Sequence, residues 1–122
     1  MGYLTYFSLT ILDEKGKEIV GDEIIKKIRN NCEAANYAFG EMGHAEDSCR
    51  WYSWSEDFIE FSKMFPNNIL MVSGEGEELD DRWISYFMDG KTQHCPGEMI
   101  YPPLDLNLIF TKKFKPRVLK NK

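Results

Sequence analysis

The segment SGEGEELDDRW, at positions 73–83, concentrates the side chains of this sequence that could do chemistry. It holds five carboxylates within seven positions: Glu75, Glu77, Glu78, Asp80 and Asp81. Carboxylate oxygens bind hard divalent cations, and they also contact the basic surfaces of other proteins. The spacing is therefore compatible with two kinds of site: a metal site and a partner-binding surface.

A divalent-cation site would make the chain a metal-dependent hydrolase of phosphodiesters. On an extended strand Glu75 and Glu77 would point to the same face, roughly 7 Å apart at Cα, and a third ligand from elsewhere would complete a Mg²⁺ site. Such an enzyme would depend on Glu77 and Asp81. The segment does not match a calcium-binding EF-hand loop, however, and no nucleophile–histidine–acid motif or zinc motif stands out. We therefore expect a protein that is not an enzyme, with no catalytic residues, no metal and no cofactor.

A nucleotide-binding pocket is a further alternative. Arg50, Arg82 and Trp83 could contact the phosphate and base of a nucleotide signal that the protein traps. The sequence GKT at positions 90–92 adds nothing to this alternative, because a phosphate-binding loop requires glycine where Ser85 stands.

The distribution of charge favours a protein partner. Positions 41–81 contain eleven acidic residues and two basic ones, whereas positions 111–122 contain six basic residues and no acidic one. An acidic body repels nucleic acid and attracts basic surfaces. We expect no direct nucleic-acid binding by this body, and we expect a partner with a basic surface. The predicted contact residues are the five carboxylates above together with Glu46, Asp47, Glu56, Asp57 and Trp54.

Hydrophobic spacing predicts the elements that position these residues. It indicates strands at 3–12, 48–54 and 67–75, a hairpin at 81–94 around Asp89-Gly90, and helices at 23–39 and 56–65. This β-α-β-α-β-β order predicts an α+β fold, a mostly antiparallel sheet with two helices on one face, of the ferredoxin-like kind. Residues 1–110 are predicted to form a single domain, followed by a basic tail at 111–122. Residues 104–110 suit a short strand or helix equally well.

Three cysteines without a CxxC pair, the lack of an apolar run of about 18 residues, and the lack of a signal-peptide pattern favour a cytoplasmic protein that does not bind a membrane. Oligomeric state is left open by the sequence.

The segment from Trp51 to Gln93 resembles small proteins of bacteriophages and mobile elements that have a ferredoxin-like domain. The resemblance rests on WYSWSEDFIEFSKMFPNN followed by SGEGEELDDRWISYFMDGKTQ, in which a helix ending in Phe-Pro precedes a strand, an acidic turn and a Gly-Lys hairpin. It implies a phage protein in the host bacterial cell. It also implies an anti-defence, anti-CRISPR-like inhibitor, whose carboxylates stand in for nucleic-acid phosphates on a host nuclease complex. Those families share no catalytic residues.

Overall fold

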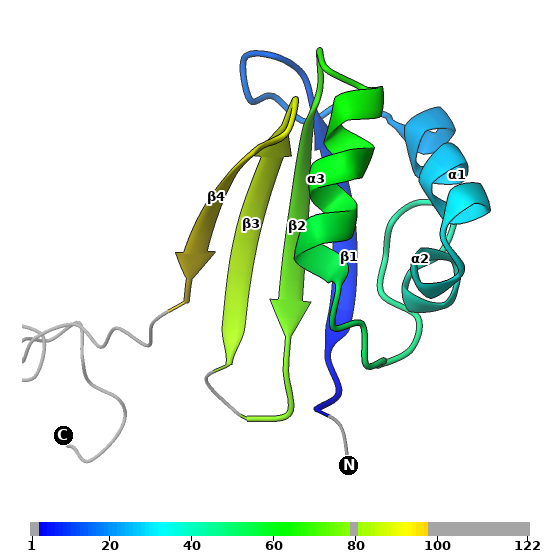
Figure 1. Cartoon of the computed structure of the whole chain (residues 1–122), viewed down its shortest axis with the longest axis vertical. Coiled ribbons are helices and arrows are strands. Elements are labelled where there is room, and N and C mark those ends of the chain that lie inside the picture. The colour runs from blue at the N-terminus through cyan, green and yellow to red at the C-terminus, as the bar shows by residue number, and fades with distance from the viewer. Residues whose placement is uncertain (1–2, 79–80, 98–122) are drawn as a thin grey trace, which may run out of the picture.

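Four strands form one antiparallel sheet in the computed structural model, which describes residues 3–78 and 81–97 (Figure 1). The strands are β1 (Tyr6–Leu12), β2 (Ile69–Glu75), β3 (Arg82–Met88) and β4 (Lys91–Pro96), and their order in the sheet is β1-β2-β3-β4. The segment predicted at 104–110 and the basic tail at 111–122 lie outside the described residues.

Three helices cover one face of this sheet: α1 (Asp22–Asn31), α2 (Glu33–Ala38) and α3 (Trp54–Met64) (Figure 1). The alternation in β1 sends Phe7, Leu9 and Ile11 toward the helices, where all three side chains are buried. Phe58 of α3 packs against Phe87 of β3 with ring centroids 5.5 Å apart. The α+β class and the antiparallel sheet are thus confirmed. None of the described helices is long and apolar enough to cross a membrane.

The strand predicted at 48–54 is wrong, and the ferredoxin-like order is not confirmed. This segment contributes an isolated bridge between Thr5 and Cys49, and α3 then begins at Trp54. Trp51 is buried from a loop, where its ring lies 5.3 Å from that of Phe7. A short aromatic run supplies core contacts from a loop as well as from a strand, so its composition misled the prediction. The chain therefore passes through three helices, rather than one, between its first two strands.

The helix predicted at 23–39 is divided in two. Cys32 has an extended backbone (φ −148°, ψ 114°), which ends α1 and begins α2. Ile28 is buried from α1 and Ala35 from α2. The break turns the second helix so that both short helices place apolar residues against β1 (Figure 1).

The hairpin predicted around Asp89-Gly90 is confirmed. Both residues have positive φ, 48° and 84°, as a two-residue turn with the twist of a β-hairpin requires. The Gly90 amide donates a hydrogen bond to the buried Ser62 hydroxyl of α3 at 2.8 Å. This contact fastens the turn between β3 and β4 to the helix layer.

Candidate partner-binding site

The acidic turn between β2 and β3 is fastened to the first described residues of the chain. The Leu4 amide donates a hydrogen bond to the Glu77 carboxylate at 2.6 Å, and the Tyr3 hydroxyl donates one to Asp81. The same Tyr3 oxygen accepts a hydrogen bond from the Glu78 amide at 3.1 Å. The turn is therefore held by side-chain contacts with a segment more than 70 positions away.

Gly74 in β2 and Gly76 in the acidic turn provide space for aromatic side chains. A Cβ atom on Gly74 would lie 2.2 Å from the indole ring of Trp83, and one on Gly76 would lie 2.5 Å from the Tyr3 hydroxyl oxygen. Neither glycine has a positive φ. Their role is thus to admit Trp83 and the Tyr3–Asp81 pair rather than to bend the chain.

Hydrogen bonding to Asp81 raises the pKa of the Tyr3 phenol above its ordinary value, because the bond favours the protonated hydroxyl.

At the last residue pair of the β2–β3 ladder, Glu75 lies opposite Arg82, and their side chains form an ion pair at 3.1 Å. Both side chains are more than half exposed, so this pair is screened by water.

The first turn of α3 lies at the same end of the sheet as the acidic turn (Figure 1). Its Asp57 accepts hydrogen bonds from the indole N–H of Trp51 at 2.8 Å and from the Ser53 hydroxyl at 2.9 Å. We name the carboxylates gathered here the acidic end: Glu56, Asp57, Glu75, Glu77, Glu78 and Asp81. Asp80 lies outside the described residues.

Glu46 and Asp47 belong to the loop between α2 and α3, and both side chains are exposed. A Cβ atom on Gly40 would lie 2.7 Å from the Glu46 carboxylate, which shows that this side chain lies over the Gly40 backbone. Asp47 lies close enough to Cys49 for its charge to add to burial in raising the pKa of that thiol. These two residues lie beside β1 rather than within the acidic end.

Trp54, the predicted aromatic contact, is half-buried and lines a hollow at the acidic end. Its ring stacks on that of Trp83, with centroids 4.2 Å apart and an interplanar angle of 16°. The hollow has a volume of about 240 Å³. We name it the aromatic hollow; eight residues line it: Tyr3, Thr5, Phe7, Trp51, Tyr52, Trp54, Asp81 and Trp83. Sequence reasoning missed Tyr3, because nothing in its local spacing indicates that it meets the acidic turn.

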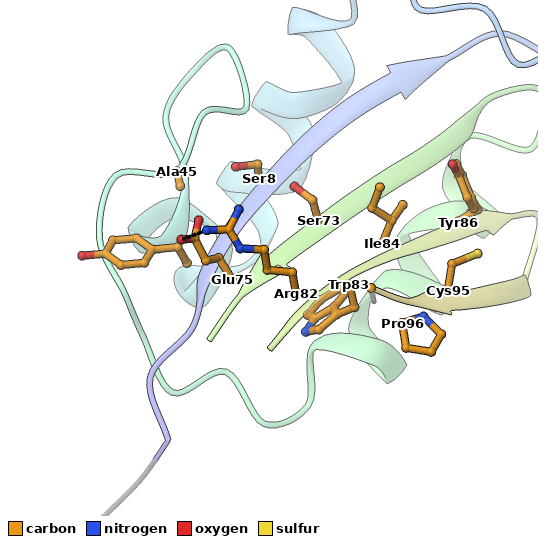
Figure 2. Close-up of a pocket in the computed structure, with 13 residues that line it drawn as sticks. Ser8, Ala45, Ser73, Glu75, Arg82, Trp83, Ile84, Tyr86, Cys95 and Pro96 are labelled. Carbon is orange, nitrogen blue, oxygen red and sulfur yellow. Dashed lines mark hydrogen bonds and ion pairs between the residues drawn. The ribbon is translucent and has the colours of Figure 1, made fainter. Parts of the chain in front are cut away.

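The face of the sheet that no described helix covers carries a larger, shallower hollow of about 680 Å³. Figure 2 shows the Glu75–Arg82 pair on one side of it, Tyr86 and Cys95 on the other, and Ser73 and Ile84 between them. Among the described residues, Arg82 supplies the guanidinium that lines this hollow, and it is paired with Glu75.

The two alternatives raised by the sequence gain no support from this geometry. Arg82 and Trp83 both line the larger hollow, but Arg82 is paired with Glu75 and the Trp83 ring is stacked on Trp54. Arg50 is exposed in a loop and does not line it. Within residues 3–78 and 81–97, no three His, Cys, Asp or Glu side chains are grouped closely enough to hold a metal ion.

Comparison of the chain with protein-family models, with curated proteins and with solved structures finds no match. The resemblance to phage and mobile-element proteins therefore stays a prediction.

Proposed function

We propose that this chain is a non-enzymatic binding protein whose acidic end contacts a basic surface of a protein partner. The observation that carries the proposal is the convergence of six carboxylates from β2, the turn between β2 and β3, and α3 on one end of the sheet, beside a hollow lined with aromatic residues. Aromatic residues concentrate where protein interfaces derive most of their binding energy, and charge complementarity speeds association.

The internal contacts of the acidic end support a preorganised surface. Glu77, Asp81 and Asp57 each accept a hydrogen bond from another part of the chain. Carboxylates fixed in this way lose little conformational freedom on binding, which lowers the entropic cost of association. Glu56 and Glu78 are exposed and add two further negative charges to the acidic end.

The expected partner is a nucleic-acid-binding protein, since its basic groups are arranged to meet a row of negative charges. Occupying that surface would inhibit the partner by excluding nucleic acid. A phage-encoded, anti-defence role in the bacterial cytoplasm is the setting that the sequence resemblance suggests for such an inhibitor, and it forms the finer part of this proposal.

Charge reversal tests the proposal. A variant with Glu56 and Glu78 changed to Lys alters two exposed side chains of the acidic end. The control changes Glu14 and Glu23 to Lys, which produces the same net charge from exposed positions elsewhere. Binding is measured by fluorescence anisotropy with a labelled lysine-rich peptide from a nucleic-acid-binding protein, at low and moderate salt.

We expect the first variant to lose at least tenfold in affinity and the control to lose much less, because association depends on local charge. Wild-type affinity should fall steeply as salt rises, and single-stranded DNA should compete for the peptide. Equal losses in the two variants would overturn the assignment of binding to the acidic end. Capture from bacterial lysate with the same pair of variants would then identify the natural partner.

A further inference from the structure

The aromatic hollow has the size of a single side chain. Its volume of about 240 Å³ is below the roughly 300–1,000 Å³ typical of pockets for drug-sized ligands. Of the eight described residues that line it, six are aromatic and none is basic. Arg50 immediately precedes Trp51 in the sequence but does not line the hollow. A nucleotide would not fit, whereas one amino-acid side chain would.

The walls of the hollow are held in place by contacts within the protein. Trp54 and Trp83 stack on each other, and Phe7 packs against Trp83 with ring centroids 5.9 Å apart. The Trp51 indole is oriented by its hydrogen bond to Asp57. Rings that are fixed before binding do not have to be ordered by the ligand.

Asp81 gives the hollow its polar group. One carboxylate oxygen, Oδ2, accepts the hydrogen bond from Tyr3, while Oδ1 accepts none from the described part of the chain. A negative charge beside aromatic rings favours a cation, because ring faces also attract positive charge. An apolar occupant would offer no hydrogen bond to Oδ1, and an anion would be repelled.

Among cations, guanidinium matches both features of the hollow. Its planar group stacks on aromatic rings and at the same time donates N–H bonds to a carboxylate. An ammonium group is more strongly hydrated and lacks a plane that stacks. We propose that the aromatic hollow receives the guanidinium group of an arginine side chain from the partner. This inference rests on the proposed function and specifies the chemistry of its central contact.

All three tryptophans of the chain line the hollow, so their indole N–H signals in NMR spectra report directly on its occupancy. The probe is a short peptide with a single arginine, compared with otherwise identical peptides that carry lysine or the uncharged isostere citrulline. We expect saturable shifts of the tryptophan signals with the arginine peptide, and binding weaker by roughly tenfold with the citrulline peptide. Equal binding of the arginine and citrulline peptides, or no saturable shift up to the solubility limit, would overturn the proposal.

Tyr52 provides a variant that leaves the core intact. It is 70% exposed while lining the hollow, and Tyr37 on α2 is 55% exposed and does not line it. We expect Tyr52→Ala to weaken binding of the arginine peptide by several-fold and Tyr37→Ala to leave it unchanged. Asp81→Asn should remove most of the preference for arginine over citrulline. Equal affinities of Tyr52→Ala and Tyr37→Ala would contradict the proposed site.

The two proposals fail in distinguishable ways. If arginine, lysine and citrulline peptides leave the tryptophan signals unchanged while charge reversal at Glu56 and Glu78 still abolishes binding of the lysine-rich peptide, the acidic end binds without the hollow. If the arginine peptide saturates the hollow but charge reversal has no effect, the hollow binds arginine and the broader proposal fails.

Discussion

The turn between β2 and β3 and the turn between β3 and β4 both combine glycine with acidic residues, but their glycines are needed for different reasons. In the second turn, Gly90 has a φ of 84°, a backbone conformation that other residues rarely adopt. Just before the first turn, near the end of β2, Gly74 has no positive φ, and a Cβ atom there would collide with Trp83. Gly90 is needed because the backbone there has a positive φ. Gly74 is needed because the Trp83 side chain of the neighbouring strand occupies the space where a Cβ atom would lie.

The two turns therefore differ in whether they depend on distant parts of the chain. The β3–β4 turn is determined by its own two residues and needs no contact with a distant segment to take its shape. The β2–β3 turn is closed by a backbone hydrogen bond from the Gly76 amide to the Asp81 carbonyl, and it is also hydrogen-bonded to Tyr3 and Leu4 through Asp81 and Glu77. The carboxylates of Asp81 and Glu77 are therefore held in these positions only when the segment of Tyr3 and Leu4 lies beside the turn.

The largest effect is expected from Gly74→Ala. The new Cβ atom would meet the Trp83 ring at 2.2 Å, which displaces an indole that stacks on Trp54. Overpacking of this kind lowers the free energy of unfolding by roughly 1–3 kcal/mol. We expect a value in the upper half of that range, measured by urea unfolding. A loss below about 0.5 kcal/mol would show that Trp83 repacks freely, in conflict with the overpacking range.

Gly90→Ala is expected to cost less, about 1 kcal/mol, because only the left-handed backbone is strained. The nearest atom to its Cβ would be Lys63 Cε at 3.1 Å, at the far end of a flexible side chain. Asn adopts the left-handed region more readily than Ala, so Gly90→Asn should recover part of the loss.

Gly74→Asn is the matched control for this rescue. It should recover nothing relative to Gly74→Ala, because the obstacle at that position is a ring rather than a dihedral angle. Recovery at both positions, or at neither, in the same unfolding assay would remove the distinction between the two turns.

The difference between local and distant requirements also explains which features could be predicted from the sequence. Asp89-Gly90 predicted its hairpin correctly because a two-residue turn carries its conformational requirement in its own residues. The sequence SGEGE was interpreted as a bend, and the space that its glycines leave for Trp83 and Tyr3 was missed, since those contacts join distant segments. The strand predicted at 48–54 failed for a related reason. The aromatic composition of that segment is consistent with burial of Trp51 and partial burial of Trp54, but it does not show that a loop supplies the first and the start of α3 the second.

For the acidic turn, the pH dependence of stability is expected to reveal the Tyr3–Asp81 contact. The hydrogen bond raises the pKa of Tyr3 in the folded state, so its stabilisation is complete below the unfolded tyrosine pKa of about 10. It is lost as the pH rises through the higher folded-state pKa. Tyr3→Phe should therefore be less stable than the wild type at neutral pH, by less than Gly90→Ala, and the difference should shrink in alkaline solution.

Unfolding of both proteins across this pH range checks the expectation. Asp81→Asn gives a second readout, because loss of the carboxylate should lower the pKa of Tyr3 in an absorbance titration of tyrosinate. A constant difference between wild type and Tyr3→Phe at all pH values would show that packing of the ring, rather than its hydroxyl, fastens the turn.

The smallest effect is expected from the ion pair at the start of the acidic turn. Glu75 and Arg82 lie directly opposite each other, but their side chains are 56% and 62% exposed. Exposed pairs of this kind contribute about 0.2–1 kcal/mol. In a double-mutant cycle with Glu75→Gln and Arg82→Gln, we expect a coupling energy near the lower limit that weakens with salt. A salt-independent coupling above that range would mean that charge pairing, rather than Tyr3 and the two glycines, orders the turn. With a small coupling, Glu75 can be neutralised without loss of stability, so any effect of Glu75→Gln on partner binding would report on the interface alone.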